Sequence, residues 1–182
     1  MRAFSLIVIL LVCLPVSAQK KKKANLKLTN AVVIGQVDTP EDRYSLEINL
    51  VELLGSYGVK STPSLNVLKL GSDARLLAQD SVLQALSAQG YNTFLLFTVK
   101  GYDRRFKPSN LSDDFERALN QGSFYDLYRE GIVSVSFEVK FFREGACVHA
   151  EVIKCGSVSD RESIMKRLRK KVGKRLKKAW KK

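Results

Sequence analysis

The sequence predicts an α/β (α+β) fold, a mixed sheet of about five strands with a parallel βαβαβ core, a C-terminal antiparallel hairpin and helices packed against it. The runs 31–37 and 93–100 are nearly continuous apolar stretches, which is typical of strands that are covered on both faces. Helical signals separate these two runs, as in βαβ units. The run 132–142 instead alternates apolar and polar residues, which indicates a half-exposed strand.

The first predicted helix follows the strand 31–37. Thr39 is a favourable N-cap residue, and apolar residues recur at helical spacing from there to Tyr57. Gly58 stands where a C-cap glycine is expected. The chain then enters a shorter and more polar strand, 59–65, which we expect nearer the edge of the sheet.

A second helix, with Asp80 as its predicted cap, leads into the central strand 93–100. The insertion 101–130 follows that strand. Within the insertion, Ser112 is the predicted cap of a short helix at 111–120. A connection of this length is more often a functional segment than an ordinary loop.

The hairpin is predicted from the strands 132–142 and 146–154, which flank a turn at 143–145. On the first strand, the residues expected to face the solvent are Ser134, Ser136, Glu138 and Lys140. On the second strand, the residues expected to face the core are Val148, Ala150 and Val152. The hairpin would make the sheet mixed.

The last predicted element is a basic helix over residues 160–182, with a capping box formed by Ser159 and Glu162. Its apolar residues recur at helical spacing and form a narrow stripe: Ile164, Leu168, Val172, Leu176 and Ala179/Trp180. The same stretch holds twelve Lys or Arg residues and two acids. The whole chain has a net charge of +13, whereas residues 30–159 hold 13 basic and 16 acidic residues, so positive charge is concentrated at the ends of a near-neutral body.

Two interpretations of this helix remain open. In the first, the stripe packs on the sheet and the basic face is simply solvated. In the second, the basic face binds an anionic surface, because each Lys or Arg near an anionic lipid surface contributes about 1 kcal/mol. Trp180 is the apolar anchor in this second hypothesis, and the cations are Lys170, Lys171, Lys174, Arg175, Lys177, Lys178, Lys181 and Lys182.

The N-terminus has the pattern of a secretory signal peptide, residues 1–18. A charged start precedes the apolar run 4–16, and Ala18 ends a small-x-small motif after which cleavage is expected. We therefore expect a periplasmic or secreted protein with a Lys-rich disordered linker at 19–29 and a single domain at 30–182. The lysines that follow Ala18 leave open an uncleaved anchor with a cytoplasmic C-terminal side.

Cys147 and Cys155 are predicted to stay unpaired, because eight residues along one strand rise about 26 Å and a disulfide needs Cα atoms within roughly 7 Å. His149, the only histidine, shares strand parity with both cysteines. Ligands spaced along one strand face cannot converge on one ion, so we predict no metal site. No catalytic arrangement of Ser, Cys and His is recognisable, and we predict neither enzyme activity nor a cofactor.

A crevice for a small ligand is the alternative site, at the carboxyl ends of the two central strands, where ligands of open α/β sheets bind. The residues expected to converge there are Asp38, Arg43, Tyr102, Asp103, Arg104 and Arg105. The competing explanation is that the acids of 38–42 start a helix and the arginines pair with them at the surface. Gly35 is a lone glycine, so no phosphate-binding loop is indicated.

The chain resembles a bacterial family of exported envelope domains in two stretches, AVVIGQVDTPEDRYSLEINLVELLGSYGVKSTPS and SVLQALSAQGYNTFLLFTV, and in the hairpin and helix that follow. The shared pattern is a strand ending in Asp, Arg43 opening a long helix, and Gly58-Val59 entering a strand with Pro63-Ser64. The fold of that family is similar to the N-terminal domain of TolB and to curli-secretion and penicillin-binding-protein-activator lipoproteins. The resemblance implies a periplasmic mixed α/β domain that acts through protein contacts, without known catalysis. Cys13 follows Val12 rather than a small residue, so the chain departs from the lipoproteins by lacking a lipobox.

The sequence thus favours a non-enzymatic cell-envelope accessory or binding domain that docks through its basic helix. The expected partner is an envelope protein or an anionic surface (phospholipid, lipopolysaccharide or cell wall), with peripheral membrane contact. Nucleic acid is not an expected partner, because the chain is predicted to be exported and has no base-reading motif. The alternative is a small-ligand binder or an enzyme that uses the crevice, and the oligomeric state stays open.

Overall fold

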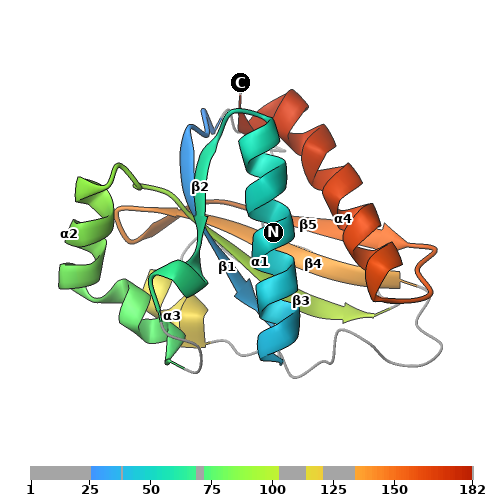
Figure 1. The fold of residues 1–182 in the computed structure, drawn as a ribbon, viewed down its shortest axis with the longest axis horizontal. Helices are drawn as coiled ribbons and strands as arrows, with labels where there is room; N and C mark the ends of the chain where they lie inside the picture. The colour runs from blue at the N-terminus through green and yellow to red at the C-terminus, as the bar shows by residue number, and fades with distance from the viewer. Residues whose placement is uncertain (1–25, 38, 69–71, 103–113, 121–133, 182) are drawn as a thin grey trace, which may run out of the picture.

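The computed structural model describes residues 26–37, 39–68, 72–102, 114–120 and 134–181. Five strands form one mixed sheet in the order β2-β1-β3-β4-β5 (Figure 1). β1 is parallel to β2 and β3, whereas β4 is antiparallel to β3 and β5. The bounds are β1 (Asn30–Gln36), β2 (Lys60–Pro63), β3 (Phe94–Tyr102), β4 (Ser134–Arg143) and β5 (Ala146–Gly156). The predicted mixed sheet, with its parallel core and C-terminal hairpin, is confirmed.

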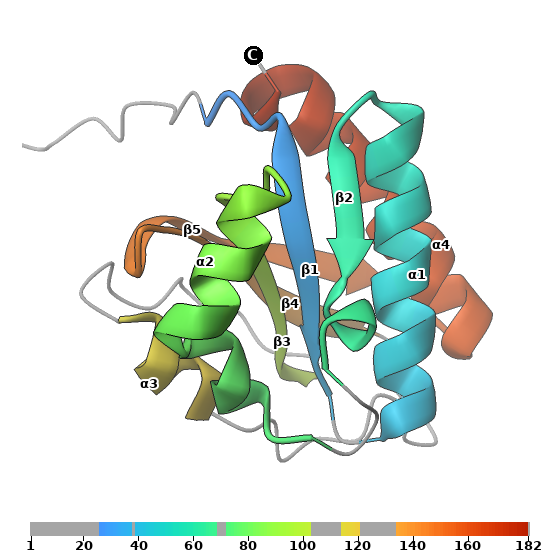
Figure 2. The ribbon, with the colours of Figure 1, turned by 60° about the vertical axis from the view of Figure 1, so that its left-hand side comes forward.

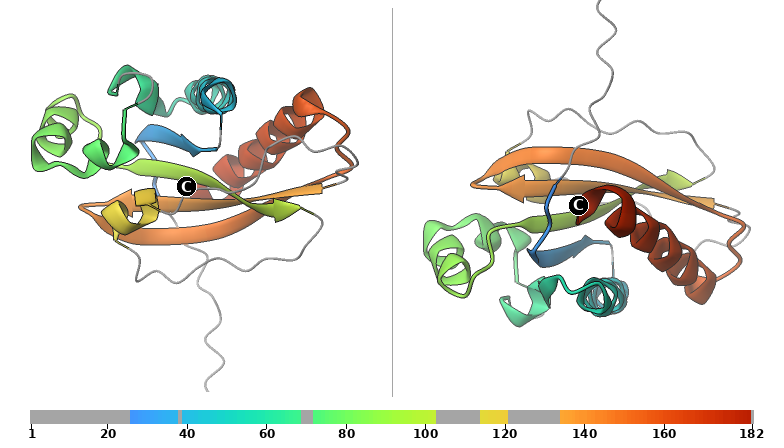
Figure 3. Two further views of the ribbon diagram at one scale, coloured as in Figure 1. Left: turned by 90° about the horizontal axis from the view of Figure 1, so that it is seen from below. Right: turned by 90° about the horizontal axis from the view of Figure 1, so that it is seen from above.

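Helices cover both faces of the sheet. On one face, α1 (Pro40–Ser56) and α4 (Arg161–Arg175) lie beside each other (Figures 1 and 3), and α4 continues as a π-helical turn, η3 (Leu176–Trp180). The opposite face carries α2 and α3, which Figure 2 shows across β1 from α1. The elements on that side are η1 (Ser64–Asn66), η2 (Ala74–Ala78), α2 (Asp80–Ala88) and α3 (Phe115–Asn120). Two separate apolar cores therefore sandwich the sheet.

The chain enters β1 along the last turn of the C-terminal helix. The backbone N–H of Leu26 donates to the carbonyl of Ala179 at 3.3 Å, and that of Leu28 donates to the carbonyl of Trp180 at 2.7 Å. Both leucine side chains are buried. The predicted disordered linker 19–29 is therefore wrong for its last four residues, because Leu26 and Leu28 alternate with exposed residues and are buried in the core.

The ends of the helices largely follow the sequence signals. The hydroxyl of Thr39 accepts a hydrogen bond from the backbone N–H of Asp42 at 3.3 Å, and Gly58 has the positive φ of a C-cap glycine, +70°. The cap of α4 lies one residue later than predicted, at Asp160, which forms a reciprocal capping box with Ser163. The predicted capping box of Ser159 and Glu162 is therefore wrong.

The polar face of β4 is buried, not solvated as predicted. Ser134, Ser136, Glu138 and Lys140 are each at most 5% exposed. The carboxylate of Glu138 lies 3.0 Å from the ammonium of Lys100 and 3.8 Å from that of Lys140. Charge pairing across neighbouring strands lets these residues be buried, which the alternation of polar and apolar residues alone does not reveal.

A β-bulge changes which residues of β5 face the cores. Phe141 pairs with His149, but Phe142 pairs with Cys147, so Val148 is an extra residue in the strand. The predicted inward position of Val148 is wrong, since it is 40% exposed, and the other two predicted inward residues of this strand, Ala150 and Val152, are only partly buried. Alternation resumes after the bulge with the opposite parity.

The bulge also separates the two described cysteines. Cys147 packs in the core beneath α2 and α3, whereas Cys155 packs in the core beneath α1 and α4. Neither of these two cysteines forms a disulfide. Burial raises the pKa of the Cys155 thiol to about 12, so it stays protonated at neutral pH. Among the described residues, no three His, Cys, Asp or Glu side chains are placed to share a metal ion.

Candidate functional site

Arg43 is the one residue of the predicted crevice whose side chain the structure describes. Asp38, Asp103, Arg104 and Arg105 lie outside the described residues, and Tyr102 is the last residue of β3. Arg43 turns inward: its Nε lies 3.0 Å from Glu47 Oε1, and its Nη2 donates to Ser64 Oγ at 2.7 Å. The prediction that Arg43 pairs with surface acids is wrong, because its partner is a buried carboxylate.

Glu47 is the centre of a buried network that joins α1 to the sheet. Its side chain is fully buried, and Oε1 accepts from the backbone N–H of Gly35 at 2.9 Å and from Ser64 Oγ at 2.6 Å. Oε2 accepts from the backbone N–H of Leu65 at 3.2 Å. A Cβ on Gly35 would lie 3.1 Å from Leu46 Cδ2, so glycine permits the close approach of the helix. The network is structural, since protein donors occupy both carboxylate oxygens.

Sequence reasoning missed Glu47 and Ser64, although one signal was present. Glu47 lies on the apolar stripe of α1, three residues before Leu50 and seven before Leu54. A carboxylate on a buried stripe needs a cation and several donors. Arg43, four residues earlier in the same helix, identifies the cation, but the contribution of Ser64 depends on strand pairing that the sequence does not show.

The second predicted site, on the C-terminal helix, is an exposed row of cations. We call it the basic ridge, and it consists of Lys166, Arg167, Lys170, Lys171, Lys174, Arg175, Lys177, Lys178 and Lys181. At about 100° per residue, these positions span about half of the helix circumference. The opposite half carries Leu168, Val172, Leu176 and Trp180 of the predicted apolar stripe, which are buried, as is Ile164. Lys182 lies outside the described residues.

The ridge has few acidic neighbours. Among the residues that the structure describes, only Arg175 of the ridge has an acidic partner, with its Nε 2.8 Å from Glu151 Oε2. The two arginines of α4 outside the ridge pair with α1 instead: Arg161 with Asp42, and Arg169 with Glu52 at 3.1 Å. The two arginines that face α1 therefore form ion pairs within the protein, and the ridge cations are exposed to the solvent.

Trp180 is part of the core and not an exposed anchor. Its side chain has no exposed surface, and its ring packs edge-on against Phe141 with the ring centroids 4.8 Å apart. Its indole Nε1 donates to Glu151 Oε1 at 2.5 Å. The predicted role of Trp180 in surface binding is therefore wrong, because an indole held in this way cannot enter a membrane without unfolding the last turn.

Glu151 links β5 to the last turn of the helix, and its contacts shift the pKa of its carboxyl. Burial alone would raise the pKa of this carboxyl. The contacts with His149 and Trp180 and the charge of Arg175 lower it further than burial raises it, so the pKa lies below its ordinary value of 4.5. A carboxyl with a lower pKa in the folded state than in the unfolded state stabilises the fold above its unfolded pKa.

We therefore expect the stabilisation from Glu151 to be complete above about pH 5 and to be lost as the pH falls through the folded-state pKa. Glu151→Gln should lower the free energy of unfolding at about pH 6 and have a smaller effect at about pH 3. Urea denaturation of both proteins across this range measures the difference. An effect of Glu151→Gln that is the same at every pH would contradict the assignment.

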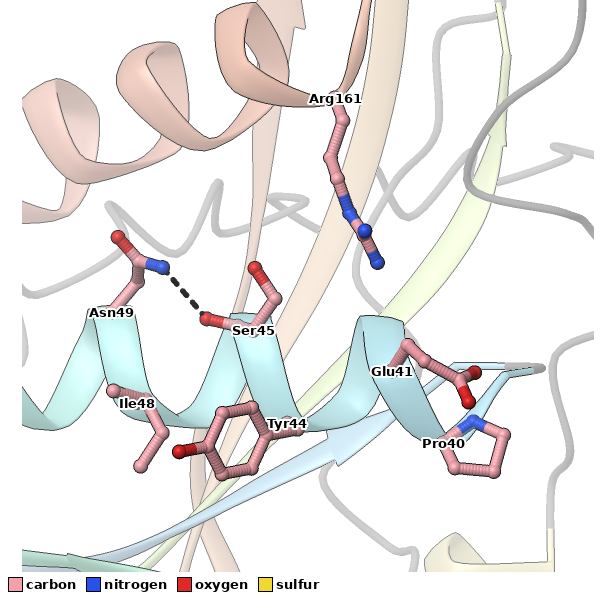
Figure 4. Close-up of a pocket in the computed structure, with 7 residues that line it drawn as sticks. All are labelled: Pro40, Glu41, Tyr44, Ser45, Ile48, Asn49 and Arg161. Atoms are coloured by element: carbon pink, nitrogen blue, oxygen red, sulfur yellow. Dashed lines mark hydrogen bonds between the residues drawn. The ribbon is translucent and has the colours of Figure 1, made fainter.

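A shallow groove of about 570 Å³ runs along α1 towards the start of α4 (Figure 4). Tyr44 is 59% exposed beside it, and the guanidinium of Arg161 reaches towards the first turn of α1, where it pairs with Asp42. The only bond drawn between the lining residues is local, from Asn49 Nδ2 to the carbonyl of Ser45 at 2.8 Å. The groove has no converging polar groups of the kind that orient a small ligand.

Comparisons with known proteins give only distant likenesses. No protein-family description matches the sequence, and no curated protein matches it either. Among solved structures, the PelC dodecamer from Paraburkholderia phytofirmans is 15% identical, with a TM-score of 0.44 over 84% of this chain and 86% of that chain. The lipoprotein GNA1162 from Neisseria meningitidis is 11% identical, with a TM-score of 0.45 over 82% of this chain and 97% of that chain.

Neither of these two structures is described as a TolB domain. TM-scores below 0.5 are no basis for assigning a function. Within the described residues, no helix has the length and apolar character needed to cross a membrane. The basic ridge is therefore the feature on which a functional assignment depends.

Proposed function

We propose that this protein is a non-enzymatic accessory domain of the bacterial cell envelope that binds an anionic surface through its basic ridge. The observation that carries the proposal is the exposure of all nine ridge cations on a body of near-zero net charge. Eight of the nine have no acidic partner among the described residues. Solubility alone does not require such a concentration of one sign of charge on one helix.

The alternative of a small-ligand site has less support. Arg43, the one crevice residue whose side chain is described, is bonded to Glu47 and Ser64 and is not available to a ligand. Export and an envelope location remain part of the proposal, since they depend on the signal-peptide pattern of residues 1–18.

Truncation of the helix is an unsuitable test, because it would remove Leu176 and Trp180 from the core. We instead propose the variant K170Q/K171Q/K174Q/K178Q, which neutralises four exposed ridge residues. At about 1 kcal/mol per residue before screening, its affinity for vesicles rich in phosphatidylglycerol should fall at least about tenfold at low salt. Co-sedimentation of residues 19–182 with the vesicles measures the affinity.

The matched control is K170R/K171R/K174R/K178R, which keeps the charge at the same four positions. This control should bind like the unmodified chain. Retained binding by the glutamine variant would contradict the proposed function, as would equal losses in both variants. Thermal unfolding of both variants verifies that they keep the fold.

A further inference from the structure

The first described residues and the last helical turn meet at one end of the molecule. Leu26 and Leu28 bond to the carbonyls of Ala179 and Trp180, so the first described residues run along the last helical turn. Figures 1 and 2 show the N-terminal segment entering β1 beside the C-terminus. Segments more than 150 residues apart in the sequence are thus held side by side.

This arrangement gathers exposed lysines from both ends. Between the two bonded leucines lies Lys27, which is exposed. The last helical turns contribute the other members of what we call the basic pole, which consists of Lys27, Lys177, Lys178 and Lys181. The pole is fixed to the body, since Lys181 Nζ donates to the carbonyl of Tyr57 at 2.5 Å and Lys177 Nζ lies 5.7 Å from the Tyr57 ring centroid.

The covalent chain places more positive charge near the pole. Lys20–Lys23 precede Leu26 by three to six residues, so they cannot lie farther than about 22 Å from it. The apolar run 4–16 ends ten residues before Leu26, within about 36 Å. Because this run precedes Leu26 in the chain, a membrane that receives it would be joined to the domain through the segment that enters β1 at the pole.

We propose that the basic pole is the membrane-facing end of the protein and that it binds the phosphate headgroups of an anionic phospholipid bilayer. This inference rests on the proposed function of the basic ridge and adds to it the lipid and the orientation. The first two turns of α4 would lie away from the bilayer. They are separated from the last turn by about 15 Å along the helix, which exceeds the Debye length of about 8 Å at physiological salt.

The test compares two triple variants of residues 19–182 that remove the same charge. The pole variant is K27Q/K177Q/K178Q, and the matched control at the far end of α4 is K166Q/R167Q/K170Q. The probe is a vesicle of phosphatidylglycerol and phosphatidylcholine. At about 0.15 M salt, where cations more than about 8 Å from the headgroups are screened, the pole variant should bind at least about tenfold more weakly than the unmodified chain, and the control at most about threefold more weakly. Replacing the four lysines 20–23 by glutamine should also weaken binding.

Each outcome supports or overturns a separate claim. Equal losses in the two triple variants would overturn the pole while leaving the proposed function intact. Stronger binding to isolated cell wall or lipopolysaccharide than to the vesicles would overturn the bilayer assignment alone. If the unmodified chain binds none of these anionic surfaces, the proposed function fails together with the inference. Thermal unfolding of each variant confirms that a lost charge, not a lost fold, causes the change.

Discussion

Replacing Trp180 by alanine should lower the free energy of unfolding by about 3–5 kcal/mol, the range for deletion of a large buried aromatic side chain. The indole fills the space between η3 and β5, packs on Phe141, and donates a hydrogen bond to Glu151. Its removal leaves a cavity and takes one hydrogen-bond donor from the Glu151 carboxylate. Small domains have total stabilities of about 5–15 kcal/mol, so this single change should be visible as a large drop in the urea midpoint.

The matched control is Tyr44→Ala, because Tyr44 is an aromatic residue that is 59% exposed on α1. Surface substitutions of this kind usually change stability by no more than about 0.5 kcal/mol. Equal effects of the two substitutions would show that the last turn does not pack on the sheet, and would restore Trp180 as a candidate for surface binding.

Replacing Glu47 by alanine should also cost about 3–5 kcal/mol, because it breaks a buried ion pair by removing one partner. The guanidinium of Arg43, whose side chain is 15% exposed, would lose its carboxylate. The backbone N–H of Gly35 and the hydroxyl of Ser64 would lose their acceptor as well. Urea denaturation measures the loss, and a circular dichroism spectrum verifies the fold.

Glu52→Ala is the control for this substitution, since Glu52 lies on the same helix in an ion pair with Arg169 and its side chain is 63% exposed. Exposed pairs contribute about 0–1 kcal/mol. If the loss for Glu47 were no larger than the loss for Glu52, Glu47 would not be the buried link between α1 and the sheet.

The elements were predictable because local signals determine them. The N-cap Thr39 and the C-cap Gly58 mark the ends of α1, and the apolar stripe of α4 was correctly expected to recur at helical spacing. The same stripe shows that Trp180 belongs with Leu176 and not with the basic face. The helical period thus places Trp180 on the buried face, which contradicts the hypothesis that it is an exposed anchor.

Other features depend on contacts between distant segments. At the bulge beside Val148, the side chains of β5 switch the face of the sheet to which they point. No local residue type in the sequence predicts this bulge. The polar residues of β4 are buried because Lys100, on the neighbouring strand, pairs with Glu138. The basic pole forms because the backbone N–H of Leu28 donates to the carbonyl of Trp180. The sequence of neither end by itself predicts this contact.

We propose that positive charge on an otherwise near-neutral body directs this protein to anionic surfaces, with no apolar side chain inserted. The most direct measurement is the fraction of residues 19–182 that co-sediments with vesicles as the salt concentration rises, for phosphatidylglycerol-rich and for pure phosphatidylcholine vesicles. We expect binding to the anionic vesicles alone, strong below about 0.1 M salt and abolished towards about 1 M, where the Debye length falls to about 3 Å. Equal binding to both vesicles, or binding that survives the high salt, would contradict it.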